Sequence, residues 1–383
     1  ARFGMPTHAN DLNGVAAAIL TAGVQAPATY GAELANDASR WGKALIARVQ
    51  ARLTTYFPLG PGEQVIAYIH ANSVACPRTG RTVPLVKDWW LRKGAGVEVS
   101  VGMVTKTGGV ELHEPLFEIL YGDKAKQAAD SGTMSRGNAI SPYDHLVIDS
   151  DYIKAEAKSG RMRQILYAVA VRDATGNRTF RSPTQADRDA LVTAEDDLAS
   201  ARARWEREEA LPTEEVPAGN KTAEPRSIGI MKWADFFTPR QLIGHAAFSE
   251  EFRQLVPEVI ADLGERRAHE VLALLALIQG KTLNWNGRLS SWDVSRQKVR
   301  SVFDQHNFAF KWTFAEFEGS ALYTWALDQI LDAYAGIAAH FDDTGRTLEG
   351  VRLRREVNVS QGNAADLDFI SSGSVAHLCV DPP

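Results

Sequence analysis

The sequence has little cysteine and no long hydrophobic run, and each shortage excludes a class of protein. Its 383 residues include two cysteines, Cys76 and Cys379, which lie far apart and argue against a disulfide framework. Such sparse thiols are typical of a reducing cytoplasm, so we predict a cytoplasmic location. No apolar run reaches the roughly 18 residues of a membrane span, and no secretory signal is visible, so we expect no membrane partner.

Two enzyme classes also lack their signatures. There is no phosphate-binding lysine loop and no Gly-x-Ser-x-Gly turn, which argues against nucleotide hydrolysis and against a serine hydrolase. The net charge is −5, so any DNA-binding face has to be a local basic patch on an acidic surface. The composition is 45% hydrophobic and 23% charged, as in globular proteins, and the length predicts two or three domains.

Strand patterns dominate the first half of the chain. Residues 4–13 are predicted to form a short strand that ends in an acidic turn. An amphipathic helix follows, with one apolar stripe made of Trp41, Leu45, Val49 and Leu53. Further strands are predicted within residues 64–71, 74–120, 145–153 and 164–172.

The second half is predicted to be mainly helical. Thr184 and Asp187 have the spacing of a capping box, and the helix that they begin is charged nearly all round, so we expect it to project into solvent. Residues 209–227 are rich in Pro and Glu and are predicted to form a linker or long loop. Thr238 and Pro239 then begin the first of three apolar helices.

The two ends of the chain look like strands of a parallel sheet, whereas the middle does not. A strand is predicted at 375–380, directly before Asp381. Ligands bind at the carboxyl ends of such strands. There, Asp11 can accept hydrogen bonds from two ribose hydroxyls. The carboxylate of Asp381 and the carbonyl of Pro382 can accept them from an exocyclic amino group, which suits a base-amino methyltransferase.

Several segments resemble, in order, one protein family. They include "GMPTHANDLNGVAAAIL", "CPRTGRTVPLVKDWWLRKG", "KSGRMRQILYAVAV", "WADFFTPRQLIGH", "SSWDVSRQKVRSVFDQHNFAFKWTFAEFE", "GNAADLDF" and the terminal "DPP". The family is the adenine-specific DNA methylase-like proteins of prokaryotic phage-defence clusters, some of which bear a zinc ribbon. The resemblance covers nearly the whole chain.

The resemblance implies a fold, a cofactor and a set of site residues. The fold would be α/β: part of a class I (Rossmann-like) methyltransferase sheet with a large α+β insertion and a helical block. S-adenosylmethionine would be the cofactor, contacted by Asp11, with Asn13 in the same turn, and by Asn363, which stands where the family usually has an acidic residue. Asp381, Pro382 and Pro383 would form the catalytic motif that holds the target adenine N6.

The chain departs from the family pattern in three places. The glycine-rich loop expected before Arg2 and the aromatic residue expected after Pro383 are absent, so we expect this to be the central part of a longer protein that binds the cofactor poorly by itself. In the ribbon-like segment Thr79 replaces the second cysteine, which leaves Cys76 alone. A structural zinc site requires four ligands, so we expect no zinc.

Two basic islands are the predicted contacts to double-stranded DNA. Residues 76–106 carry six positive and two negative side chains, a local +4, and residues 154–163 carry four and one, a local +3. The DNA-facing interpretation competes with a solvated face around two core tryptophans, Trp89 and Trp90. The predicted DNA-binding residues are Arg78, Arg81, Lys87, Arg92, Lys93, Lys154, Lys158, Arg161 and Arg163.

An aromatic-dense stretch lies between the apolar helices. Its residues would form either a packed core, which the apolar flanks favour, or a base-stacking platform. They are Trp285, Trp292, Phe303, Phe308, Phe310, Trp312, Phe314 and Phe317.

Together these features predict four segments and one function. Residues 1–60 would be methyltransferase core, 61–230 a target-recognition insertion, 231–345 a helical block, and 346–383 a return to the core. The predicted function is an S-adenosylmethionine-dependent DNA adenine-N6 methyltransferase of a prokaryotic anti-phage, restriction-modification type of system, with other defence proteins as further partners. The alternative is a non-catalytic DNA-binding or assembly subunit of a defence complex.

Overall fold

A computed structural model describes residues 5–94, 96–304, 308–344 and 356–380 of the chain. The fold is mixed α/β, 45% helical and 23% strand, with several small sheets, which confirms the α/β class. The chain divides into two compact units. Unit 1 comprises Ala1–Leu45, Gln254–Gln279 and Trp325–Pro383, and unit 2 comprises Ile46–Arg253 and Gly280–Thr324.

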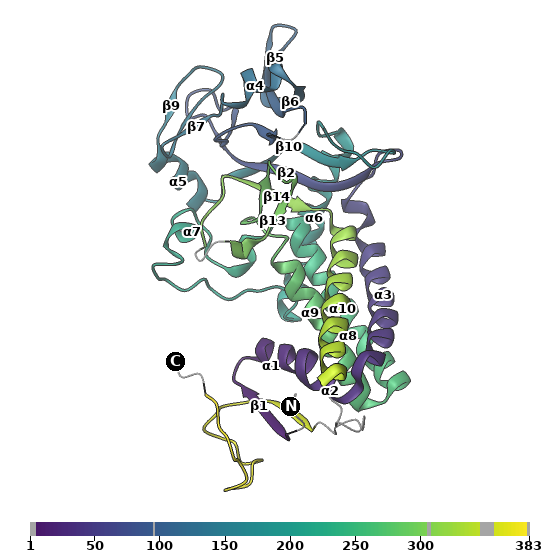
Figure 1. Ribbon diagram of the computed structural model, residues 1–383. Helices are drawn as coiled ribbons and strands as arrows, with labels where there is room; N and C mark the ends of the chain where they lie inside the picture. Colours follow the sequence, from purple (N-terminus) through teal and green to yellow (C-terminus); the bar gives the residue numbers. More distant parts are fainter. Residues whose placement is uncertain (1–4, 95, 305–307, 345–355, 381–383) are drawn as a thin grey trace. The chain divides into compact units, whose positions relative to one another are not determined.

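The sheet of unit 1 consists of two parallel strands from opposite ends of the sequence (Figure 1). β1 (Thr7–Asp11) pairs with β15 (Val357–Gln361), and the register sets Asp11 against Gln361. The chain then continues from β1 into α1 (Gly14–Leu20), a π-helical turn η1 (Thr21–Gln25), α2 (Ala26–Tyr30) and η2 (Gly31–Glu33).

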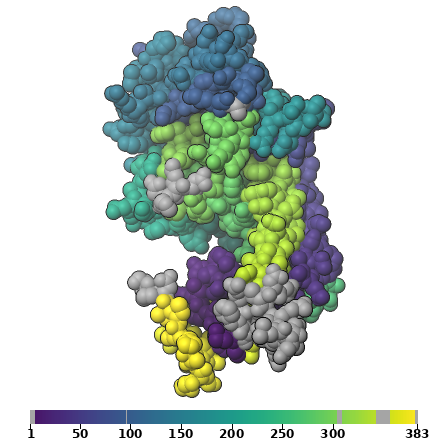
Figure 2. Space-filling model, in the orientation of Figure 1, coloured from purple at the N-terminus to yellow at the C-terminus, as the bar shows by residue number. Residues whose placement is uncertain are grey.

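The C-terminal strand therefore lies earlier than the sequence predicts. The expected strand at 375–380 is wrong, since the described backbone there forms no strand. Every side chain from 371 to 380 is exposed, so the apolar residues of this stretch bury nothing that would support a strand. Figure 2 shows this part of the chain, in yellow, at the surface.

Four long helices contain the boundaries between the units, and they confirm the predicted helices. The buried stripe of the first includes Leu45, Val49 and Leu53, all fully buried. The second begins after Thr238, whose Oγ1 accepts a hydrogen bond from the backbone N–H of Gln241 at 3.2 Å. The four are α3 (Leu34–Leu53), α8 (Pro239–Leu263), α9 (Glu265–Leu283) and α10 (Gly319–Thr344).

The main sheet of unit 2 is antiparallel and has the order β11-β10-β2-β14, with β3 paired to the end of β2. Figure 1 labels β10, β2 and β14 of this sheet. Between Val65 and Val74 no residue of β2 is exposed, because this strand lies inside the sheet and is packed on its faces. The strands are β2 (Gln64–Ala75), β3 (Thr82–Pro84), β10 (Arg163–Arg172), β11 (Arg178–Arg181) and β14 (Thr313–Phe317).

Smaller elements complete unit 2. The three small sheets are β4 (Trp90–Arg92), β5 (Val99–Thr107) and β6 (Val110–Tyr121); β7 (Met134–Ser135), β8 (Asn138–Ile140) and β9 (Val147–Ile148); and β12 (Ser291–Asp293) with β13 (Lys298–Arg300). The helices are η3 (Thr54–Tyr56), α4 (Asp123–Ala129), α5 (Ser150–Lys158), α6 (Gln185–Arg207), α7 (Ala223–Ser227), η4 (Trp233–Phe236) and η5 (Val302–Asp304). No helix in the described ranges is both long enough and apolar enough to cross a membrane.

Two local predictions are wrong for identifiable reasons. The strand predicted at 145–153 ends at Ile148, because the Asp149 carboxylate accepts hydrogen bonds from the N–H groups of Asp151 and Tyr152 and begins α5. α6 has the predicted capping box but does not simply project into solvent. Leu198 and Trp205 on one of its faces are buried.

Gly132 allows one close backbone crossing in unit 2. A Cβ at this position would lie 2.0 Å from the backbone oxygen of Lys87, inside any acceptable contact. We expect Gly132→Ala to destabilise the protein by about 1–3 kcal/mol, as overpacking does, measured as a lower midpoint of urea unfolding. Gly219→Ala is the control for loss of glycine in a loop, since its φ is outside the left-handed range and a Cβ there would meet only the Thr222 hydroxyl, at 3.9 Å. Equal midpoints for wild type and Gly132→Ala would contradict the expected clash.

Candidate functional site

The carboxyl ends of β1 and β15 lie side by side in unit 1. The two strands are parallel, and the N–H of Gly362 donates to the backbone oxygen of Asp11 at 3.0 Å, so the pairing continues to the last residue of each strand. Asp11 and Asn363, separated by most of the sequence, therefore belong to adjacent turns. We refer to residues 10–13 and 360–363 as the β1/β15 tip.

Asn10 connects the two halves of the β1/β15 tip. Its Nδ2 donates to the backbone oxygen of Gly362 at 2.8 Å, and its Oδ1 accepts from the hydroxyl of Ser360 at 2.8 Å. Sequence reasoning missed this role. Asn10 directly precedes the acidic turn and has the sequence context of an ordinary turn residue. The one feature that could have indicated its role is an amide side chain next to Asp11.

Asp11 and Asn13 form the turn that starts α1. One carboxylate oxygen of Asp11 accepts the N–H of Asn13 at 2.8 Å, and Oδ1 of Asn13 accepts the N–H of Val15 at 2.8 Å as the N-cap. The second oxygen of Asp11 has no hydrogen-bond partner among the described residues, and the side chain is partly exposed. Asp11 is thus oriented by the turn and still able to accept hydrogen bonds from a ligand.

Asn363 presents an amide in the neighbouring turn. Its Oδ1 accepts the N–H of Ala365 at 3.0 Å, which leaves the Nδ2 group as a donor toward solvent. The structure thus brings the three predicted cofactor-binding residues, Asp11, Asn13 and Asn363, to one end of one sheet. Asp381, Pro382 and Pro383, the predicted catalytic motif, lie outside the described residues.

The ribbon-like segment forms a tight turn between β2 and β3. Gly80 has a φ of 69°, and its N–H donates to the backbone oxygen of Cys76 at 2.8 Å, which closes the turn. Cys76 is buried with Asp144 as its polar neighbour, 3.8 Å from the sulfur. In the described ranges no three His, Cys, Asp or Glu side chains gather in a metal-binding arrangement.

Acidic neighbours compensate several of the predicted DNA-binding residues. Arg78 pairs with Asp144 at 2.6 Å, Arg81 with Glu111 at 3.0 Å, and Arg161 with Glu156 at 2.7 Å. Lys154 lies 3.7 Å from Asp151, Arg92 donates to the backbone oxygen of Val97, and Lys93 lies over the ring of Trp90. Lys87, Lys158 and Arg163 are exposed and have no ion-pair partner in the described part of the chain.

The two neighbouring tryptophans of the first island have different environments. Trp89 is 1% exposed and packs edge-on against Tyr167, with ring centroids 5.5 Å apart. Trp90 is half-buried, and its Nε1 donates to Asp130 at 3.3 Å. The core interpretation is therefore confirmed for Trp89, while Trp90 lies at the surface beside Lys93.

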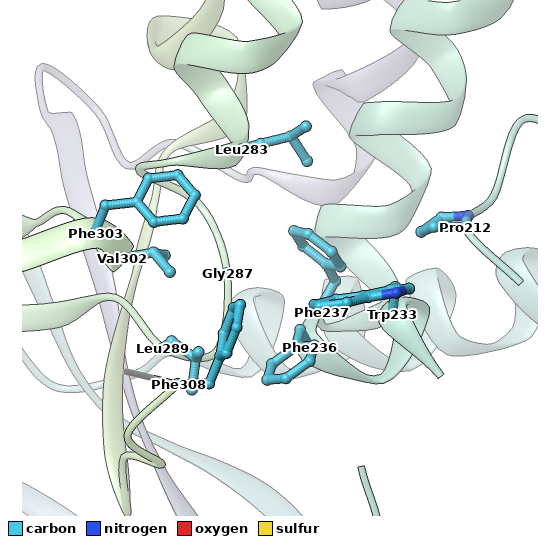
Figure 3. A pocket seen from close by; sticks show the side chains of 10 residues that line it. All are labelled: Pro212, Trp233, Phe236, Phe237, Leu283, Gly287, Leu289, Val302, Phe303 and Phe308. Atoms are coloured by element: carbon cyan, nitrogen blue, oxygen red, sulfur yellow. The ribbon is translucent and has the colours of Figure 1, made fainter. Parts of the chain in front are cut away.

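The aromatic-dense stretch contributes to the core and to one cavity. Phe314 is fully buried and stacks on His70, and Phe310 packs against Trp312. Phe303 and Phe308 line a cavity of about 270 Å³ together with Trp233, Phe236 and Phe237 (Figure 3). All the lining side chains are apolar apart from the indole nitrogen of Trp233. A nucleobase would leave its polar edge unpaired there, so the cavity does not suit base recognition.

A buried ionic cluster lies beneath the main sheet of unit 2. The guanidinium of Arg240 donates to both oxygens of Glu316, at 3.0 and 2.7 Å, and both side chains are 0% exposed. Nε2 of His70 lies 3.2 Å from Glu316. Burial raises the pKa of Glu316, but the charge of Arg240 outweighs it and brings this pKa to about 2, while burial lowers the pKa of His70. The cluster is enclosed and serves the fold.

Comparison with models of protein families, with curated proteins and with solved structures finds no match to this chain. By its fold, the chain is a mixed α/β protein in which a parallel strand pair presents Asp11 and Asn363 at its carboxyl end.

Proposed function

We propose that this chain carries the cofactor-binding and DNA-contacting parts of an S-adenosylmethionine-dependent DNA adenine-N6 methyltransferase of a prokaryotic anti-phage system. The observation that supports the proposal most is the parallel register of β1 and β15, which sets Asp11 beside Gln361 and brings Asn363 into the adjacent turn. We further propose that these two strands belong to a partial class I, Rossmann-like sheet.

The polar groups of the β1/β15 tip fit the nucleoside part of the cofactor. A carboxylate with one unused oxygen at the end of a parallel strand suits the vicinal hydroxyls of a ribose. The amide of Asn363 can donate to a ring nitrogen of adenine through Nδ2, in place of an acidic residue that could only accept. Asn10 holds the two turns together and so fixes the spacing between these groups.

The proposed reaction assigns the remaining steps to the catalytic motif and the basic islands. When bound, S-adenosylmethionine supplies an electrophilic methyl group. Asp381 and the carbonyl of Pro382 accept hydrogen bonds from the N6 amino group of the target adenine and orient its lone pair. The target base has to leave the duplex first, and exposed cations such as Lys87 and Lys158 hold the phosphate backbone while it does.

The test is a calorimetric titration of S-adenosylmethionine into the full-length gene product and into its Asp11→Ala variant, because this chain by itself is expected to bind the cofactor poorly. A hydrogen bond to a charged group contributes about 1.5–3 kcal/mol, so we expect affinity to fall at least about tenfold in the variant. Asp123→Ala is the control, because this carboxylate is 91% exposed at the start of α4, in unit 2.

Two outcomes would count against the proposal. Equal affinity in wild type and Asp11→Ala would remove the assignment of the β1/β15 tip. DNA binding without any cofactor binding would favour the alternative, a non-catalytic DNA-binding or assembly subunit.

A further inference from the structure

A second arginine of unit 2, Arg288, is partly exposed and has no carboxylate partner among the described residues. Its Nη1 donates to the backbone oxygen of Asp235 at 2.8 Å and its Nη2 to Oδ1 of Asn72 at 3.2 Å. Its Nε has no hydrogen-bond partner in the described ranges. Arg240, by contrast, meets both oxygens of Glu316. Charged groups enclosed by protein are normally paired, so the partly enclosed guanidinium of Arg288, with its Nε unpaired, is suited to bind an anion.

The nearest carboxylate does not supply that anion. Oδ2 of Asp235 accepts the N–H groups of Met231 at 2.9 Å and Lys232 at 2.8 Å, and only the backbone of Asp235 bonds to Arg288. The amide of Asn72 is also held in place beside Arg288, because its Nδ2 donates to the backbone oxygens of Lys311 and Trp312. Burial lowers the pKa of Arg288 to about 10, which still leaves the group charged at neutral pH.

Arg288 lies at the wall of a cavity of about 220 Å³ that also contacts Arg202 of α6 and Gln164 of β10. A neighbouring depression of about 320 Å³ shares Arg202 and Gln164 and adds Arg163. Two carboxylates, Glu195 and Asp235, face the same space. Arg202 is paired with Glu206 at 3.3 Å, and the Asp235 carboxylate is bound to backbone N–H groups. The guanidinium of Arg288 is therefore the charge in this space that no described carboxylate meets.

We propose that this cavity binds a phosphoryl group, held by the Arg288 guanidinium with Arg202 at the rim. Guanidinium groups match the oxygens of a phosphate with parallel hydrogen bonds, and the volume accommodates a phosphate with part of the molecule that carries it. Arg163 belongs to the second basic island, so the favoured source is a backbone phosphate of DNA. That source, though not the cavity itself, rests on the proposed function. A free phosphate ester is the other source.

The experiment uses the whole protein and three variants. Arg288→Met removes the partly buried charge. Arg202→Ala removes a side chain that is 45% exposed and pairs with Glu206, a loss that the fold tolerates more easily. Arg207→Ala is the matched control, since five residues along α6 place Arg207 about 140° around the helix from Arg202. Binding of a fluorescein-labelled DNA duplex is measured by anisotropy at several salt concentrations. The thermal midpoint is measured with and without orthophosphate.

If the site holds a DNA phosphate, both Arg202→Ala and Arg288→Met weaken duplex binding several-fold. The slope of log K against log salt then becomes shallower by about 0.9 for each lost contact, while Arg207→Ala matches wild type. In a second outcome, orthophosphate raises the thermal midpoint of wild type but not of Arg202→Ala or Arg288→Met, and DNA binding is the same in all three. This outcome supports a phosphoryl site whose ligand is a free phosphate ester and not DNA.

The proposal is overturned if neither DNA affinity nor the orthophosphate effect depends on Arg202. The test remains valid if Arg288→Met fails to fold, because the Arg202→Ala measurements alone can then overturn the proposal. Cofactor titration with Asp11→Ala uses a different unit and a different ligand, so failure of the phosphoryl site and failure of the proposed function are separate outcomes.

Discussion

Replacing Arg240 with methionine is expected to lower the free energy of unfolding by about 3–5 kcal/mol, because it leaves a buried carboxylate without its counter-charge. Arg240 and Glu316 are both fully buried and joined by two hydrogen bonds. The guanidinium also lies 4.1 Å from the ring centroid of Tyr68 and donates to the backbone oxygen of Tyr56. Methionine fills much of the same space but satisfies none of these groups.

Urea unfolding followed by circular dichroism measures the loss. Arg40→Met is the control, since Arg40 makes an ion pair with Asp262 but is 53% exposed, and a much smaller loss is expected there. Combining Arg240→Met with Glu316→Leu should recover part of the stability, because the orphaned charge is gone. A double variant no more stable than Arg240→Met alone would show that the charge is not the cause.

The pH dependence of the same variants has a definite sign. In wild type the pKa of Glu316 is depressed from 4.5 to about 2, so its contribution is complete above about pH 4.5 and is lost as pH falls toward 2. Without Arg240, burial raises the pKa of Glu316 and only the contact with His70 opposes it, so stability now falls as pH rises through and above 4.5. Arg240→Met should therefore lose less stability, relative to wild type, at pH 4 than at pH 7.

Trp89→Ala is expected to lower the free energy of unfolding by about 3–5 kcal/mol, the range for removing a large aromatic side chain from a core. Trp89 is 1% exposed, contacts Phe117 and Tyr167 with centroids 5.9 and 5.5 Å away, and donates its indole N–H to the backbone oxygen of Ser131. Alanine leaves both a cavity and an unpaired carbonyl at this position.

The adjacent tryptophan provides the matched control. Trp90→Ala should lower the free energy of unfolding by only about 1–2 kcal/mol, because its ring is partly exposed under the ammonium group of Lys93. Both variants are compared by the midpoint and slope of urea unfolding. Similar losses for the two would contradict the different environments of these neighbouring residues.

Local signals in the sequence predicted most helices, because capping and apolar spacing act within a few residues. Thr184 with Asp187 and Thr238 with Pro239 begin helices where predicted. Asp149 shows the limit of this approach. Its apolar surroundings look like a strand, and only the hydrogen bonds from the next two N–H groups to its carboxylate reveal a helix start.

The candidate site was harder to predict, because its parts come from opposite ends of the chain. Asp11 and Asn363 could be named from the sequence, but the strand that carries Asn363 was expected nearer the C-terminus. Asn10 and Arg288 could not be found at all. Asn10 matters through its contacts with residues some 350 positions away, and Arg288 stands out only because no carboxylate in the described ranges meets it.

The side chain of Gln25 determines on which edge of the unit 1 sheet a further strand could pair. The N–H of Thr7 donates to Glu356 and that of Gly362 to Asp11, so even-numbered residues of β15 face β1 and Val359 faces the opposite edge. The N–H of Val359 already donates to Oε1 of Gln25 at 2.8 Å. An incoming strand would have to displace this amide to pair with β15, whereas the outer edge of β1 offers the backbone groups of His8 and Asn10. Any enlargement of this sheet is thus directed to the β1 side.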